Sequence, residues 1–375
     1  MFRHAIPIGK IFGISIDLDY TWFLAFGLLT WILAVSYYPA EFKHWGVAEY
    51  WFMGAFTALI LFVSVLLHEL GHSVVAKRYG IAVPRITLFI FGGVSEIATE
   101  PTSPQVEFWI AAAGPIVSFA LALIFWELRP FLVFSAPLLA LAKYLAILNF
   151  ALGLFNLVPG FPLDGGRVFR SIIWAITGNF RHSSAIATVI GRLFGFFFIF
   201  LGVWEAFAGN AFNGLWIAFI GWFLESAAAS QGRMQAIKDL LGGHRVSEVM
   251  SHDFPQVPGN VTLQDVVDRH VLGQGRRCFV VTNGEGSAGL VTLSTIKEVP
   301  RSAWPKVTAS QVMIPLKKVD SIQPAAELWT AFEKMGRDGV NQLPVLSGEK
   351  GDGIVGMLSR DDLVNYLRVL QVLRN

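Results

Sequence analysis

Apolar residues divide the chain into two unequal parts. From residue 21 to residue 229, apolar segments of membrane-spanning length follow one another. Beyond residue 229, charged residues recur at ordinary density and short apolar runs alternate with polar ones. The pattern predicts a membrane domain over residues 1–230, a linker over 231–243 and a soluble domain over 244–375.

Six segments are long and apolar enough to cross a bilayer. They are residues 20–38, 52–78, 106–128, 134–158, 185–207 and 211–229. Between the second and third, β-branched and aromatic residues alternate around Gly92 and Gly93, which predicts a strand or hairpin at the membrane face. Residues 8–20 have similar strand character and are expected to pair with it.

Lysine and arginine in the short loops predict the orientation of the spans. They follow the second, fourth and sixth spans, for example at Lys77, Arg167 and Lys238, and are scarce on the opposite side. Both termini are therefore expected in the cytoplasm. The single cysteine excludes an internal disulfide, and with no targeting sequence this suits a multi-pass protein of a bacterial or archaeal inner membrane. The net charge of +2, without a basic run, argues against nucleic acid as a partner.

The second span carries the sequence His68-Glu69-Leu70-Gly71-His72 directly after an almost purely apolar run. On a helix, His68 and His72 project from one face, where two imidazoles can share a zinc ion, and Glu69 can act as general base for a water that the metal activates. The alternative is three polar residues solvated at a helix end. Ionisable groups in a membrane helix cost roughly 2.5–3.5 kcal/mol each and mark function, which favours the zinc site.

A catalytic zinc needs a third protein ligand, and Asp164 is the best candidate. It lies in the sequence NLVPGFPLDGGR, residues 156–167, where Pro159 and Pro162 break the fourth predicted helix. Irregular backbone at membrane depth is tolerated where it lines a cavity. The alternative for Asp164 is an Asp-Gly turn at a helix end, which the upstream histidine pair makes the weaker interpretation.

These paired sequences, in this order and on six spans, resemble the site-2 protease family of intramembrane zinc metalloproteases. The resemblance implies that His68, His72 and Asp164 bind zinc and that Asn156 stabilises the oxyanion or positions the substrate. For Asn156 a hydrogen bond at the helix end or between helices is the alternative. Residues 88–94 resemble the family's membrane-embedded sheet, so an unwound substrate segment is expected to add as a strand beside Gly92 and Gly93.

The soluble part contains an internal repeat, over about 244–300 and 306–370. The matching segments are 246–250 with 309–313, 277–281 with 342–346, and 289–292 with 356–359. Each copy is expected to run strand, helix, strand, strand, helix. This pattern resembles a tandem pair of cystathionine-β-synthase-type (CBS) domains, so the expected fold is a six-span α-helical membrane domain with a small membrane-associated β-sheet, followed by an α/β CBS pair.

The CBS resemblance implies an adenine nucleotide such as ATP, ADP or AMP in the cleft between the repeats. The family's Ser/Thr-x-x-Asp element falls on Ser359 and Asp362, while in the first copy it falls on Thr292 and Thr295, where the aspartate is missing. At most one nucleotide site keeps the pattern. The alternative is a purely structural pair, or one through which two copies of the chain associate.

The predicted function is therefore hydrolysis of peptide bonds in the transmembrane segments of other membrane proteins, with the CBS pair as regulator. One alternative is a CBS-regulated metal transporter or channel, which would need polar ligands distributed over several spans. Another is a catalytically inactive scaffold, against which the intact ligands and Glu69 argue.

Overall fold

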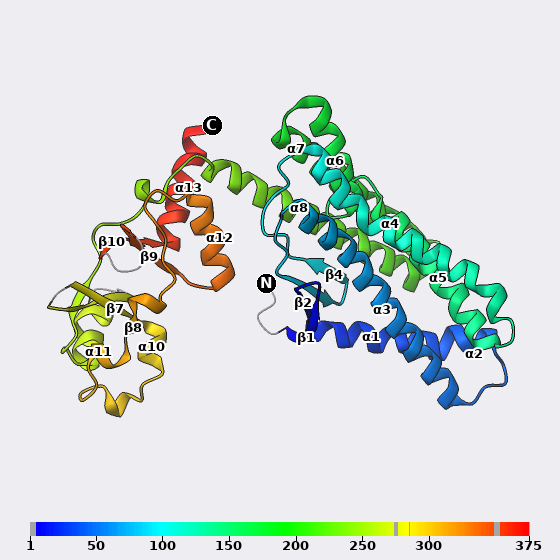
Figure 1. Ribbon diagram of the computed structural model, residues 1–375, viewed down its shortest axis with the longest axis horizontal. Helices are drawn as coiled ribbons and strands as arrows, with labels where there is room; N and C mark the ends of the chain where they lie inside the picture. Colours follow the sequence, from blue (N-terminus) through cyan, green and yellow to red (C-terminus); the bar gives the residue numbers. More distant parts are fainter. Residues whose placement is uncertain (1–4, 274–276, 285, 349–352, 375) are drawn as a thin grey trace. The chain divides into compact units, whose positions relative to one another are not determined.

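The computed structural model describes residues 5–273, 277–284, 286–348 and 353–374. The chain divides into two compact units, residues 1–235 and 236–375, each described here by itself (Figure 1).

Among its described residues, the first unit contains six helical segments that are long and apolar enough to cross a membrane, as predicted. Three of them are single helices: α3 (Val47–Arg78), α5 (Ala136–Asn156) and α7 (Phe180–Phe207). The first span joins α1 (Tyr20–Ile32) through a π-helical stretch to α2 (Tyr38–Glu41); the third is α4 (Pro104–Leu128) with one further turn, and the last is α8 (Ala211–Leu241). A shorter helix, α6 (Asp164–Thr177), lies between α5 and α7. Asp19, Ser103 and Asn179 cap α1, α4 and α7 with their side chains.

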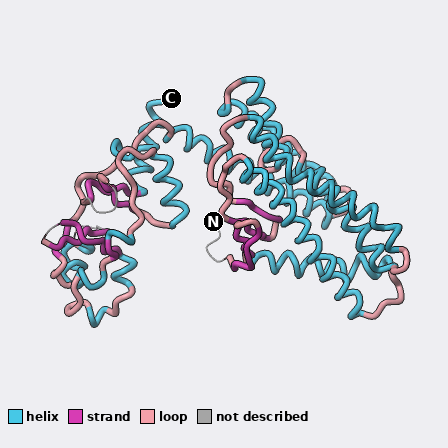
Figure 2. The backbone as a smooth tube through the Cα atoms, in the orientation of Figure 1, coloured by secondary structure: helices cyan, strands magenta, loops and turns pink. Residues whose placement is uncertain are grey.

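A four-stranded sheet completes this unit. Its strands are β1 (Ile6–Ile11), β2 (Ile14–Leu18), β3 (Arg85–Phe89) and β4 (Gly92–Ser95), in the spatial order β1-β2-β3-β4. Two antiparallel hairpins join through the parallel pair β2–β3, which confirms the predicted pairing of the N-terminal segment with the 79–105 region. Figure 2 shows the strands gathered where α1 begins.

The sheet packs on α3 and α4 through a small apolar core, in which Ile14, Ile16 and Ile86 of the sheet meet Leu70 and Ile110 of the helices. Helix α4 is central, because α3, α5 and α6 all pack against it (Figure 1). Because α3 and α6 both pack on α4, the end of α3 that carries the two histidines lies next to the start of α6, which carries Asp164.

The second unit contains the two predicted repeats and is an α/β fold. The first consists of β5 (Gln256–Pro258), α9 (Leu263–Asp265) with a π-helical continuation, β6 (Cys278–Asn283), β7 (Gly286–Thr292) and α10 (Leu293–Lys297). The second consists of α11 (Ala309–Val312), β8 (Ile314–Pro315), α12 (Leu328–Asp338), β9 (Gln342–Leu346), β10 (Ile354–Ser359) and α13 (Arg360–Arg374). Strand β8 joins the sheet of the first repeat, in the order β5-β6-β7-β8, and β9 pairs with β10.

Helix α8 continues through most of the predicted linker. The sequence prediction ended the sixth span at residue 229 because charges return there, yet residues 231–241 stay helical. They include good helix formers such as Met234, Gln235 and Ala236, and charged side chains interrupt hydropathy without interrupting a helix. The helix ends before the glycine pair, where Gly243 has a φ of +85°.

Candidate metal centre

Three ionisable side chains from two helices converge in the first unit. His68 and His72 lie one turn apart near the end of α3, and Asp164 is the first residue of α6. Asp164 Oδ2 lies 3.1 Å from the Nε2 atom of each histidine, and the two Nε2 atoms are 3.3 Å apart. Both histidines are buried and Asp164 is nearly so. Within the described residues this is the group of histidine and carboxylate side chains whose geometry suits a metal ion.

The spacing of these three atoms fits zinc. Zinc binds nitrogen and carboxylate oxygen at about 2.0–2.2 Å in tetrahedral sites, so neighbouring ligand atoms should lie about 3.3–3.5 Å apart. The three measured separations agree with this to within a few tenths of an ångström. Two imidazoles and a carboxylate are also a donor set of catalytic zinc sites, which leave one position open.

Each histidine is fixed through its other ring nitrogen. His72 Nδ1 donates to the backbone carbonyl of Ile110 (2.7 Å), and His68 Nδ1 is 2.8 Å from Ser118 Oγ. Both partners lie on α4. A hydrogen bond at Nδ1 sets the tautomer and ring orientation, and it leaves Nε2 available as a metal ligand.

Gly114, on the same face of α4, leaves room for the two rings. A Cβ atom at this position would lie 2.1 Å from His72 Nε2 and 2.6 Å from His68 Nε2. No side chain can occupy that space without displacing the predicted ligand atoms. The close approach of the two histidine rings therefore accounts for a glycine at this position.

Glu69 lies directly against strand β4. Its Oε2 accepts a hydrogen bond from Ser95 Oγ (2.7 Å), and a Cβ atom on Gly93 would come within 2.5 Å of its Cγ. The carboxylate is half-buried and adjoins His68 in the chain. The structure thus brings together the predicted base, the three predicted ligands and one of the two predicted substrate-binding glycines.

The turn before α6 is tightly packed, and glycines make this packing possible. A Cβ atom on Gly165 would lie 2.3 Å from the carbonyl of Leu157, and one on Gly166 would lie 2.4 Å from the carbonyl carbon of Gly160. These glycines directly follow Asp164 in the chain. Their structural reason is the close approach of the 157–160 backbone to the first turn of α6.

Asn156 ends α5, a few residues before Asp164. Its amide nitrogen donates to the carbonyl of Leu152, one turn earlier on the same helix (3.1 Å). A hydrogen bond at the helix end is the alternative role that the sequence offered for Asn156. A role for Asn156 in stabilising an oxyanion stays a prediction.

Sequence reasoning missed several supporting residues. Ser118 follows Gly114 by four positions, so helical spacing could have placed both on one face. Ser95 follows Gly93 by two positions on a strand, and a period of two could have placed both toward Glu69. The carbonyl of Ile110 carries no signal in the sequence, because every residue has one.

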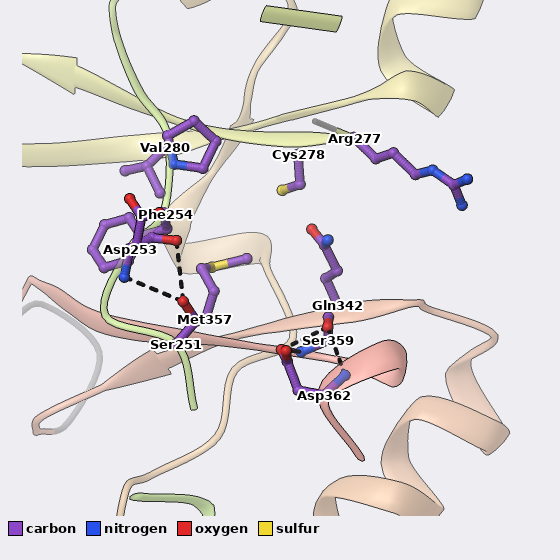
Figure 3. Close-up of a pocket in the computed structure, with 11 residues that line it drawn as sticks. Ser251, Asp253, Phe254, Arg277, Cys278, Val280, Gln342, Met357, Ser359 and Asp362 are labelled. Carbon is purple, nitrogen blue, oxygen red and sulfur yellow. Dashed lines mark hydrogen bonds between the residues drawn. The ribbon is translucent and has the colours of Figure 1, made fainter. Parts of the chain in front are cut away.

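In the second unit, Ser359 and Asp362 line a pocket of about 130 Å³ together with residues of the first repeat, among them Arg277 and Cys278 of the β6 region. Figure 3 shows Cys278 directed into the pocket from one side, with Gln342, Ser359 and Asp362 on the other. Ser359 Oγ donates to Asp362 Oδ2 (2.6 Å), and the Asp362 amide donates back to Ser359 Oγ (3.1 Å). This is also the hydrogen-bonding pattern of a helix cap at the start of α13.

Comparisons with known proteins agree with this division. A family model described as Peptidase family M50 matches residues 56–135 and 132–202, and a model described as CBS domain matches residues 246–302 and 309–369. Rip3 of Mycobacterium tuberculosis, named as a candidate zinc metalloprotease, is 34% identical over 374 residues, covering 99% of this chain and 94% of Rip3. Zinc metalloprotease MJ0392 of Methanocaldococcus jannaschii is 29% identical over 372 residues, covering 99% of this chain and 98% of the relative. Among solved structures, the site-2 protease from Methanocaldococcus jannaschii is 31% identical and covers 61% of this chain and 96% of its own, with a TM-score of 0.43.

Proposed function

The chain belongs to peptidase family M50 and is a zinc metalloprotease of the site-2 protease type; on that premise we propose that it hydrolyses peptide bonds within transmembrane segments of other membrane proteins. The observation that carries the proposal is the convergence of His68, His72 and Asp164 on one point, with Glu69 beside it on a membrane-spanning helix. Intramembrane ionisable groups are costly, and four in one place are best explained by chemistry.

His68, His72 and Asp164 would hold the zinc ion. When bound, zinc polarises a peptide carbonyl and acidifies a water molecule. Glu69 takes a proton from the attacking water and later delivers it to the leaving amine. The Ser95 hydroxyl, which donates to Glu69 Oε2, holds the carboxylate in one orientation and leaves its other oxygen free for this transfer.

Strand β4 is the proposed substrate platform. It lies at the edge of the sheet, paired with β3 on one side, and Gly93 on it contacts Glu69. An edge strand offers unpaired backbone groups to an extended segment, and a substrate helix must unwind before its carbonyls can react. A segment added beside Gly92 and Gly93 would therefore lie next to the proposed base.

The CBS pair is proposed as the regulator, with ATP, ADP or AMP in the pocket that Ser359 and Asp362 line. Arg277 supplies a cation for phosphate, and the hydroxyl and carboxylate of the second repeat suit a ribose and phosphate. Association of two copies through the CBS units belongs to the same proposal.

The proposed location is the inner membrane, with both termini in the cytoplasm. In a Cys278→Ser background, single reporter cysteines test this orientation. A membrane-impermeant thiol reagent should label N210C, between α7 and α8, in intact cells, and R181C, in the first turn of α7, only in inverted vesicles. The opposite result would overturn the orientation.

The decisive experiment is the Glu69→Gln substitution in the full chain. The variant should retain one zinc ion per chain by elemental analysis and lose roughly 10²- to 10⁴-fold in cleavage of a model transmembrane peptide in detergent. Glu49→Gln, the same change in the exposed first turn of α3, is the matched control and should cleave normally. His68→Ala should lose the zinc.

Wild-type cleavage by Glu69→Gln would overturn the proposed mechanism. The carrier alternative would instead be supported if the wild-type chain cleaved no peptide but carried zinc into liposomes, and if Glu69→Gln lost this zinc flux.

A further inference from the structure

A second set of buried charges lies in the first unit, apart from the three predicted ligands. Glu107, in the first turn of α4, is fully buried, and Arg170 of α6 is 5% exposed. Arg170 Nε donates to Glu107 Oε1 (2.8 Å), and Arg170 Nη2 contacts the same oxygen. Arg167 Nε approaches that oxygen at 4.0 Å. A carboxylate and two guanidinium groups therefore meet where α4 and α6 pack together.

Glu107 belongs to the same face of α4 as the groups that hold the histidines. Glu107, Ile110, Gly114 and Ser118 follow at intervals of three, four and four residues, which is the spacing of one helix face. Ile110 and Ser118 form hydrogen bonds with the two histidines, and Gly114 lies against both rings. The fourth position, Glu107, forms the ion pair with Arg170 of α6. One face of α4 thus holds the two histidines and also holds the helix that begins with Asp164.

Arg170 is itself fixed from several sides. Its guanidinium carbon lies 5.0 Å from the ring centre of Phe161 and 4.6 Å from that of Phe180, and its Nη1 donates to Ser184 Oγ (3.3 Å). These partners belong to the loop before α6 and to the start of α7. The guanidinium therefore joins α4 to α6 and α7, with the aromatic contacts that arginine favours.

Net stability is a weak explanation for this pair. Burying two charges costs desolvation energy that their attraction often only balances, and an apolar pair of similar volume is commonly as stable. In addition, Glu107 Oε2 has no hydrogen-bond partner among the described residues. Two guanidinium nitrogens of Arg170 on the one oxygen Oε1 of Glu107 do, however, define the direction of approach as well as the distance.

We propose that Glu107 and Arg170 are positioning residues, whose ion pair holds the first turn of α6 at the distance from α4 that places Asp164 Oδ2 opposite the two histidine Nε2 atoms. The pair touches neither zinc nor substrate. It acts through the helix that carries Asp164, so its loss should loosen metal binding more than it loosens the fold. This proposal rests on the zinc site proposed above.

The test replaces both charges at once, as Glu107→Leu with Arg170→Met, so that no uncompensated charge is left buried. The zinc dissociation constant is measured in detergent by competition with a chelator, alongside the thermal unfolding temperature. Supporting groups around a metal are typically worth 10- to 100-fold in affinity, and we expect a loss of that size. The unfolding temperature should stay close to that of the control.

The matched control is another arginine–glutamate pair between helices of this unit, Arg192 of α7 and Glu225 of α8, whose Nε and Oε1 atoms are 2.8 Å apart. Arg192→Met with Glu225→Leu should bind zinc as the wild type does. Equal zinc affinity in the Glu107/Arg170 double variant and in this control would overturn the proposal.

If the Glu107/Arg170 double variant does not fold, Arg170→Lys replaces it, because lysine keeps the charge and removes the contact of two nitrogens with Glu107 Oε1. A folded Arg170→Lys protein with wild-type zinc affinity would overturn the proposal, and weakened zinc binding would support it. His68→Ala separates the two hypotheses: if it also binds zinc normally, the proposed zinc site fails before the positioning role is in question.

Discussion

Each unit contains a small polar motif that the sequence predicts to be a binding site, and the two motifs differ in the direction of their polar atoms. His68, His72 and Asp164 come from two helices and direct their ligand atoms at one shared point. Ser359 and Asp362 are three residues apart and direct their polar atoms at each other. The first arrangement joins side chains from distant parts of the chain. The second already serves the fold as a helix cap.

The first CBS repeat makes the same point. Thr292 and Thr295, which lack the aspartate, exchange backbone-to-hydroxyl hydrogen bonds of 3.0 and 3.3 Å at the start of α10. Both repeats thus build a cap in this position, and only the second adds a carboxylate to it. Side chains that converge from distant segments are stronger grounds for a binding site than a local motif whose atoms satisfy one another.

The variant with the largest expected effect tests whether His68, His72 and Asp164 form a metal site. Gly114→Ala places a Cβ atom where the predicted ligand atoms lie, 2.1 Å from His72 Nε2. The ring must move by an ångström or more, and misplacement of that size costs roughly 100-fold in activity. We expect such a loss in peptide cleavage, together with weaker zinc binding by elemental analysis after dialysis.

Gly27→Ala, on α1, is the control for this change, since nothing lies within 4 Å of a Cβ atom there. Normal zinc content and normal cleavage in Gly114→Ala would contradict the predicted ligand arrangement.

Ser118→Ala should have a smaller effect on the same site. It removes the hydroxyl that contacts His68 Nδ1 and leaves the ligands themselves in place. We expect zinc affinity, measured by chelator competition, to fall roughly 10- to 100-fold. Ser183→Ala removes a buried hydroxyl that bonds to Asn179 and Thr177 in the turn between α6 and α7, and it should leave zinc affinity unchanged. Equal affinities in the two variants would mean that Ser118 does not orient the ring.

Asp362→Ala and Thr295→Ala test whether the second motif is more than a cap. Each removes part of a cap and should destabilise its repeat by about 1 kcal/mol in chemical denaturation. The two variants should differ in their response to AMP. AMP should raise the unfolding temperature of the wild type and of Thr295→Ala but not that of Asp362→Ala. If AMP has no effect on the wild type, the proposed nucleotide site is wrong and the motif is only a cap.

The prediction with the smallest expected effect on cleavage concerns Cys278 in the same pocket. Burial raises the pKa of its thiol to about 11, so the native state favours the neutral form. A pKa raised on folding contributes stability that is complete below the unfolded value near 9 and disappears as the pH rises through 11. Denaturation of the wild type between pH 8 and pH 11 should therefore show a loss of stability that Cys278→Ala lacks. Parallel pH profiles for the two proteins would contradict this.

The sequence could predict the features that depend on residue type and spacing. Hydropathy located the six spans because each must match the thickness of a bilayer, and helical spacing placed His68 beside His72. Alternation of β-branched residues found the strands of the membrane sheet, including the pairing of β2 with β3. Asp164 was predicted because it is a carboxylate among the apolar spans, in a segment that Pro159 and Pro162 interrupt.

The remaining features depend on three-dimensional contacts that leave little trace in the sequence. The bond from His72 to the carbonyl of Ile110 could not be predicted, since a backbone group has no signature. The pairing of Glu107 with Arg170 joins residues 63 positions apart, and nothing local connects them. The extension of α8 to Leu241 was missed because hydropathy reports the membrane boundary and not the end of a helix.

The parallel pairing of β2 with β3 has a consequence for biosynthesis. The two strands are separated by α1, α2 and α3, so β2 leaves the ribosome well before its partner exists. Until residues 85–89 emerge, the β1–β2 hairpin has an open edge, which is a site for wrong pairing. Since β4 extends the sheet from β3, the proposed platform beside Glu69 cannot assemble before residues 92–95 have been synthesised. A nascent chain halted before that point carries both histidines and Glu69 but lacks β4 and Asp164, so we expect no cleavage while the chain is being made.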